Sequence, residues 1–337
     1  MNVLPWHREA LARLLATRER MPHALLLQGR AGIGKVEFAR ALAAAVLCES
    51  PRNGLACGQC ASCHWLAQGN HPDYREIVPE AASDDDEEGE EAAKADKAKS
   101  LVIKIDQVRA VADFIALTTH RDGYRVLLIH PAEAMPPAAA NALLKTLEEP
   151  PPRTLIVLVS GQPARLLATI RSRCRQVTLP PPDRSAALRW LESEGVPGAE
   201  EALAAAGGAP LLARELAQPE EAELRRRIVG ELARPGGADA MQLAAALEKG
   251  ALPRLVFWMQ TWVHDLVRVR ASGEPRHHVG QAQALRARAR GARLEDLFDL
   301  DQDLVEARRL ISHPLNARLV AEHLLMAYNR ATMEGRP

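Results

Sequence analysis

The feature that most constrains the fold of this chain is a glycine-rich loop between a predicted strand and a predicted helix. The apolar run 24–27 leads into Gly-Arg-Ala-Gly-Ile-Gly-Lys at 29–35, and a helical pattern continues to residue 48. In such a loop glycines let backbone N–H groups turn toward an anion, and a lysine reaches the terminal phosphates. A chance glycine-rich turn is the alternative, which the flanking strand and helix disfavour. The predicted phosphate-binding residues are Gly29, Gly32, Gly34 and Lys35.

Two further apolar runs predict additional strands of the same sheet. Residues 125–129 and 155–159 are continuous and rich in β-branched side chains, as in strands that are buried on both faces of a parallel sheet. Between them, apolar residues at helical spacing run up to the prolines at 150–152, where a helix must stop. Beyond a second proline cluster at 180–182, the apolar spacing predicts helices only.

The length and composition favour several domains that are rich in helix. A chain of 337 residues suits two or three domains, and 47% hydrophobic residues with only 4% aromatic residues argue against an all-β sandwich. We predict an α/β domain over residues 1–181, a small helical domain over 182–224 and a second helical domain over 225–337. The strongly acidic stretch within 80–100 cannot bury a core and predicts a disordered loop.

The charge balance limits the classes of partner that are expected. Lys and Arg total 43, as do Asp and Glu, so the formal net charge is zero and any contact with DNA should be local or shared with other proteins. No apolar run approaches the roughly 20 residues that cross a bilayer, which predicts no membrane contact. The first residues also lack the layout of a secretory signal, so we expect a cytoplasmic protein with reduced cysteines.

Four of the five cysteines are clustered between residues 48 and 63. Their spacing, C-x8-C-x2-C-x2-C, lets neighbouring thiolates converge on one tetrahedral ion. Four sulfur ligands leave no open position, so the cluster predicts structural zinc without catalysis; His64 and His71 are alternative ligands nearby. The lone Cys174 is predicted to be a small buried residue. The predicted metal ligands are Cys48, Cys57, Cys60 and Cys63.

The residues that would hold magnesium are missing from the phosphate loop. Val36 stands where a nucleotide-hydrolysing protein has a Ser or Thr hydroxyl. The strand at 125–129 should end in acidic residues, but His130 and Pro131 follow it. His130 is predicted to be a neutral loop residue, because the sequence shows no partner for it. We therefore predict that the fold of the nucleotide pocket is retained but that the pocket does not hydrolyse nucleotide. These residues do not decide whether a nucleotide binds there without being hydrolysed.

Several motifs resemble a known family. The sequence Asn-Ala-Leu-Leu-Lys-Thr-Leu-Glu-Glu-Pro-Pro at 141–151, followed by Ser-Arg-Cys at 172–174, is similar to AAA+ clamp-loader subunits of bacterial DNA polymerase III. The resemblance is strongest over residues 1–182, and it implies an AAA+ ATPase-like domain, a helical lid and a helical collar. Further matching motifs are Pro-Trp at 5–6, His-Ala-Leu-Leu-Leu at 23–27 and Gly-Asn-His-Pro-Asp-Tyr at 69–74.

The resemblance also implies a function within an assembly. In this family, five subunits form an arc that opens the sliding clamp and places it on primed DNA during replication, and gamma/tau subunits hydrolyse the ATP. The departures at Val36, His130 and Pro131 resemble the subunit of that assembly that does not hydrolyse ATP. Its partners would be the delta and gamma/tau subunits. Arg173 matches an arginine that projects into a neighbouring ATP site, where it would neutralise charge on the γ-phosphoryl group. The alternative is that Arg173 makes a plain salt bridge or covers the sheet edge, and Arg171 and Arg175 are neighbouring candidates for the same role.

Other functions are weighed against this one. An active gamma/tau-type ATPase would need the magnesium ligands that Val36 and His130 replace. A zinc-dependent nucleic-acid-binding module would need basic and aromatic residues among the cysteines, where Arg52, His64 and Trp65 alone are found. A polymerase or nuclease site would need clustered carboxylates on a scaffold, and the one dense acidic run lies in the predicted disordered loop.

Overall fold

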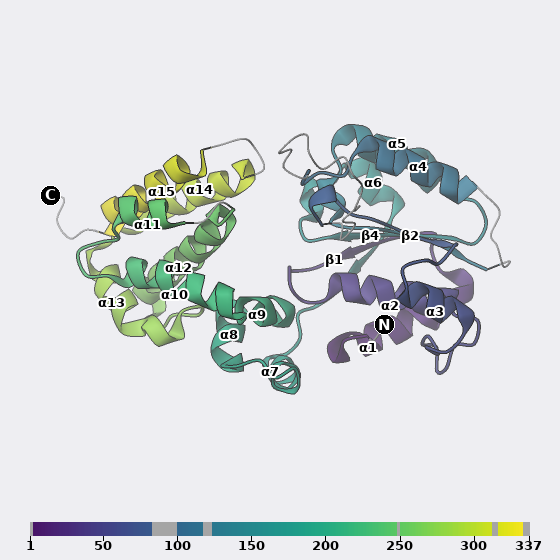
Figure 1. Ribbon diagram of the computed structural model, residues 1–337, viewed down its shortest axis with the longest axis horizontal. Helices are drawn as coiled ribbons and strands as arrows, with labels where there is room; N and C mark the ends of the chain where they lie inside the picture. The colour runs from purple at the N-terminus through teal and green to yellow at the C-terminus, as the bar shows by residue number, and fades with distance from the viewer. Residues whose placement is uncertain (1–2, 83–99, 117–122, 248–249, 312–315, 333–337) are drawn as a thin grey trace, which may run out of the picture. The chain divides into compact units, whose positions relative to one another are not determined.

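The computed structural model divides the chain into two compact units, Met1–Pro182 and Asp183–Pro337 (Figure 1). The boundary falls at the proline cluster that the sequence marks as a linker. Most of the predicted acidic loop lies outside the described residues, and the division of the second unit into lid and collar stays a prediction. The structure describes residues 3–82, 100–116, 123–247, 250–311 and 316–332.

The first unit is built on a parallel sheet with the strand order β2-β3-β4-β1-β5. Strands β3 and β4 are buried along their whole length and β1 is buried up to Gln28, and Leu26 of β1 pairs with Leu158 of β4. The three apolar runs of the sequence are β1, β3 and β4, so the predicted α/β class is confirmed. The strands are β1 (Ala24–Gln28), β2 (Tyr74–Ile77), β3 (Arg125–Ile129), β4 (Thr154–Ser160) and β5 (Arg175–Thr178).

Helices cover both faces of this sheet, as Figure 1 shows for α4, α5 and α6 on one side and α1 and α2 on the other. Because side chains alternate along a strand, Leu127 and Ile156 enter the core beneath α4 and α5, while their neighbours are buried on the opposite face. The helices of this unit are α1 (Arg8–Leu15), α2 (Lys35–Leu47), α3 (Ala61–Ala67), α4 (Ile105–Ala116), α5 (Pro137–Glu148) and α6 (Ala168–Arg173). Short 3-10 turns lie at Pro5–His7, Arg18–Arg20, Glu80–Ala82, Ala132–Ala134 and Pro163–Arg165.

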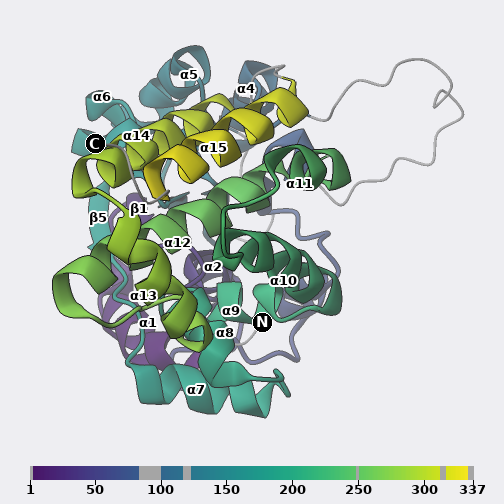
Figure 2. The same ribbon diagram turned by 90° about the vertical axis from the view of Figure 1, so that its left-hand side faces the viewer.

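The second unit is helical throughout its described residues. Its core contains Trp258, Trp262 and Tyr328, all fully buried, and the Trp262 indole donates a hydrogen bond of 3.0 Å to the Tyr328 hydroxyl. The helices, all labelled in Figure 2, are α7 (Arg184–Ser193), α8 (Ala199–Ala205), α9 (Pro210–Leu216), α10 (Pro219–Ala233), α11 (Ala240–Ala246), α12 (Leu252–Ser272), α13 (Ala282–Gly291), α14 (Leu294–Leu310) and α15 (Ala317–Thr332), with a 3-10 turn at Val279–Gln281.

Helix α10 runs without a break through residues 224 and 225, where the sequence predicts the small helical domain to end. A domain boundary at that point would therefore divide a continuous helix. Among the described helices, none combines the length and the apolar character needed to cross a membrane.

Candidate metal centre and phosphate loop

The predicted phosphate loop joins β1 to α2. Gly32 and Gly34 have φ values of +73° and +92°, which glycine adopts without strain. The Lys35 side chain is buried at the start of α2, and its ammonium group donates a hydrogen bond of 2.6 Å to the Arg30 carbonyl oxygen. Val36 follows on the helix, so no hydroxyl group occupies that position. The loop has the shape of an anion site but lacks its expected magnesium ligand.

The segment that begins the chain packs against this loop. The side chains of Trp6 and His7 both donate hydrogen bonds to the Ile33 carbonyl oxygen, at 3.0 and 2.8 Å. A Cβ atom on Gly34 would lie 2.1 Å from the Leu4 side chain, so a larger residue cannot replace this glycine without displacing the segment. The Pro-Trp motif thus has a structural role, which is to hold the loop in position.

His130 takes part in a closed polar cluster at the end of β3. Its Nε2 atom lies 2.6 Å from Glu76 Oε1 on β2, and the Arg40 side chain on α2 and the Tyr74 hydroxyl also donate hydrogen bonds to this carboxylate. Burial raises the pKa of Glu76, but the hydrogen bonds from His130, Arg40 and Tyr74 outweigh it and hold the pKa at about 2. Sequence reasoning missed Glu76, because strand pairing brings it to His130 from 54 residues away.

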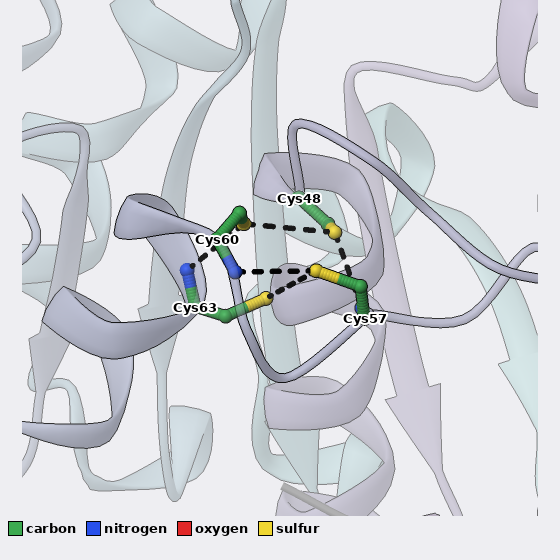
Figure 3. A group of neighbouring side chains, drawn as sticks. All are labelled: Cys48, Cys57, Cys60 and Cys63. Carbon is green, nitrogen blue, oxygen red and sulfur yellow. Dashed lines mark hydrogen bonds between the residues drawn. The ribbon is translucent and has the colours of Figure 1, made fainter.

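The four predicted cysteines come together, as Figure 3 shows. All four sulfur atoms lie within 4.8 Å of one another, with Cys48 and Cys60 at 3.9 Å and Cys57 and Cys63 at 4.0 Å. Four thiolates around one tetrahedral zinc ion, with Zn–S bonds near 2.3 Å, have sulfur atoms roughly 3.8 Å apart. The donor set and its dimensions therefore fit a closed metal centre.

Backbone N–H groups point at these sulfur atoms. Cys57 Sγ accepts hydrogen bonds from the amides of Gln59 and Cys60, and these bonds lower the pKa of Cys57 to about 6. Burial raises the pKa of the Cys63 thiol to about 12. Cys48 Sγ accepts a similar bond from the Cys57 amide. Such bonds stabilise negative charge on sulfur, which is the form that binds a metal ion.

The cysteine segment is tied to the sheet by His71, which is not itself a member of the sulfur cluster. His71 Nε2 donates to the Ser62 hydroxyl at 2.8 Å, and Ser62 in turn donates to the Leu47 carbonyl oxygen at 2.7 Å. The Asp73 amide donates to His71 Nδ1 at 3.0 Å. His64 instead forms a hydrogen bond of 3.1 Å with the side chain of Gln68, the residue that follows α3. The Gly-Asn-His-Pro-Asp-Tyr motif therefore anchors the metal segment.

Arg173 is the last residue of α6. Its guanidinium group forms an ion pair of 2.5 Å with Glu148 at the end of α5 and also donates to the Thr169 carbonyl oxygen at 3.0 Å. Both charged side chains are partly exposed, at 34% and 49%. The adjacent Cys174 is buried, as predicted, and this burial raises the pKa of its thiol to about 11.

Comparisons with known proteins agree with this arrangement. A family model described as "DNA polymerase III, delta subunit" matches residues 7–183. The chain is 40% identical to the DNA polymerase III subunit delta' of Pseudomonas aeruginosa, with 79% of this chain and 78% of that protein covered, and 35% identical to that of Escherichia coli, with 84% and 79% covered. It is 30% identical to the same subunit of Yersinia pestis over 99% of this chain and 98% of that protein. The chain belongs to the delta-prime family of bacterial DNA polymerase III clamp-loader subunits.

Proposed function

We propose that this chain is a non-hydrolysing subunit of the clamp loader, a stator that helps to place the sliding clamp on primed DNA. The observation that carries the proposal is the pair of losses around the phosphate loop. Val36 has no oxygen for magnesium, and His130, at the end of the strand where an acidic ligand would be, is hydrogen-bonded to Glu76. Without a magnesium site, the developing charge of phosphoryl transfer has no metal to neutralise it.

The experiment that tests this proposal is an ATPase assay on the isolated chain with magnesium. We expect no turnover above background, and the same background from Lys35→Ala. Steady hydrolysis that Lys35→Ala abolishes would favour the alternative of an active gamma/tau-type ATPase. In a mixture with delta and gamma/tau subunits, we expect the chain to enter a defined five-subunit complex that loads clamps.

Arg173 is proposed to act on a neighbouring subunit's ATP in that complex. Its ion pair with Glu148 is partly exposed, and such pairs contribute only about 0–1 kcal/mol, so a phosphate group can displace the carboxylate at little cost. Arg173 is the last residue of α6, and within the described residues Glu148 is its only ion-pair partner. This position suits a side chain that projects outward.

The Arg173 proposal can be separated from a structural role. We expect Arg173→Ala to leave assembly intact and to lower the ATPase rate of the complex by about tenfold or more. Arg175→Ala, in the exposed part of β5, is the matched control and should have little effect. If Arg173 served only to hold Glu148, then Glu148→Gln would lower the rate as much as Arg173→Ala does, and the finger role would be refuted.

Zinc is the proposed ion for the cysteine cluster, with a structural role. Four thiolates with no open position suit zinc and leave no place for a reacting water molecule. A nucleic-acid-binding role for the segment is less well supported, because its polar anchors, Ser62 and His71, are turned toward the protein interior and are buried.

A further inference from the structure

A carboxylate that the sequence pattern did not single out, that of Glu133, lies near the lysine of the phosphate loop. Glu133 lies in the short turn after β3, and its Oε1 atom accepts hydrogen bonds from two successive backbone amides after β4, Gly161 at 2.9 Å and Gln162 at 3.1 Å. Its other oxygen, Oε2, is buried and has no hydrogen-bond partner within the described part of the chain. The carboxylate is thus held in position, with Oε2 buried and Oε1 near the surface.

This carboxylate faces the lysine of the phosphate loop. A Cβ atom on Gly161 would lie 3.4 Å from Glu133 Oε1 and 4.0 Å from Lys35 Nζ, so the two charged groups flank the same point. Burial lowers the pKa of Lys35, and the negative charges of Glu133 and Glu37 oppose that shift. Two converging N–H groups and a buried ammonium are the groups that bind phosphate oxygens in proteins.

We infer that Glu133 is a built-in anion that occupies the terminal-phosphate end of the loop and excludes polyphosphate ligands from it. A phosphate group at Lys35 would lie close to the Glu133 carboxylate, which already occupies the Gly161 and Gln162 amides, and the two negative charges would repel each other. Glu133 therefore determines the ligand preference of the loop, which would otherwise accept a pyrophosphate group. The inference deepens the proposed non-hydrolysing role and rests on it.

The test compares binding of inorganic pyrophosphate and of ADP, without magnesium, to the full chain and to two variants by calorimetry at fixed ionic strength. Glu133→Gln keeps an oxygen that can accept from the Gly161 amide but removes the charge, and Glu133→Ala removes both. We expect no measurable binding to the unaltered chain and measurable binding to both variants, with dissociation constants at least about tenfold below the detection limit of the assay. Adding Lys35→Ala to either variant should remove the gained binding.

Glu37→Gln is the matched control, because Glu37 also acts on Lys35 through its charge but does not bond to Gly161 or Gln162. The inference is overturned if the unaltered chain binds pyrophosphate as tightly as the variants, if neither variant gains binding, or if Glu37→Gln gains as much. If Glu133→Ala fails to fold, Glu133→Gln alone decides. ATP hydrolysis measured on the same samples is a separate readout. Turnover by the unaltered chain counts against the proposed non-hydrolysing function. Binding of pyrophosphate by the unaltered chain without turnover counts only against the role of Glu133.

Discussion

The carboxylate of Glu76 has a folded-state pKa of about 2, below its ordinary value of 4.5, and this difference links the charge to stability. Because the folded-state pKa is depressed, the stabilisation is fully present above about pH 4.5 and is lost as the pH falls toward 2. We expect Glu76→Gln to lower the free energy of unfolding at pH 7 by roughly 2–3 kcal/mol and to flatten its decline below pH 4.5. Urea denaturation at a series of pH values measures both effects.

The control for that experiment is Glu9→Gln, which breaks an exposed ion pair with Arg13 and should change stability by less than about 0.5 kcal/mol. If the free energies of unfolding of Glu76→Gln and of the unaltered chain fall in parallel between pH 5 and 2.5, the pKa of Glu76 is not depressed in the folded protein.

Individual site residues differ in how far the sequence could predict them. The four cysteines were predictable, because their spacing alone implies convergence on one ion and the structure brings them together. Glu76 and Glu133 were not, because each acts through a partner that only the folded sheet supplies. His130 was read as a residue without a partner for the same reason, since β2 and β3 pair in a register that the sequence does not display.

At the level of elements, the sequence predicts the central strands β1, β3 and β4 but not the edge strands β2 and β5. The three central strands are buried on both faces and read as continuous apolar runs. The edge strands were missed because neither carries such a run: β2, with the sequence Tyr-Arg-Glu-Ile, is partly buried, and β5, with the sequence Arg-Gln-Val-Thr, is largely exposed. Prolines marked the end of α5 and the boundary between units, because proline disfavours a continued helix.

The cysteine segment is the element for which metal binding and folding should coincide. We expect about one zinc ion per chain in protein prepared without a histidine tag, and none in a Cys57→Ser, Cys60→Ser double variant. Because structural zinc contributes roughly 10–16 kcal/mol to the folding of such sites, amides of residues 48–69 should exchange much faster in that variant, while those of β1 and β4 change little.

Cys174→Ser serves as its control, because this buried thiol lies outside the sulfur cluster and its removal should leave the metal content unchanged. Metal analysis and hydrogen exchange together decide the matter: a full complement of zinc in the double variant, or its absence from the unaltered chain, would show that the cluster is not the metal centre.

For the whole molecule, each of the two units has its own core, so we expect two separable unfolding transitions in calorimetry. Tyr328→Phe should lower the unfolding temperature of the second unit, Asp183–Pro337, and leave that of the first unit unchanged. The Tyr328 hydroxyl accepts from Trp262 Nε1 and donates to the Leu232 carbonyl oxygen at 2.6 Å, so its loss leaves two buried groups unpaired and costs about 1–3 kcal/mol. Removal of the metal should lower the unfolding temperature of the first unit, Met1–Pro182, which contains the cysteine cluster. A single transition that both changes shift equally would mean that the units unfold as one, and the helical half could not then serve as an independent assembly module.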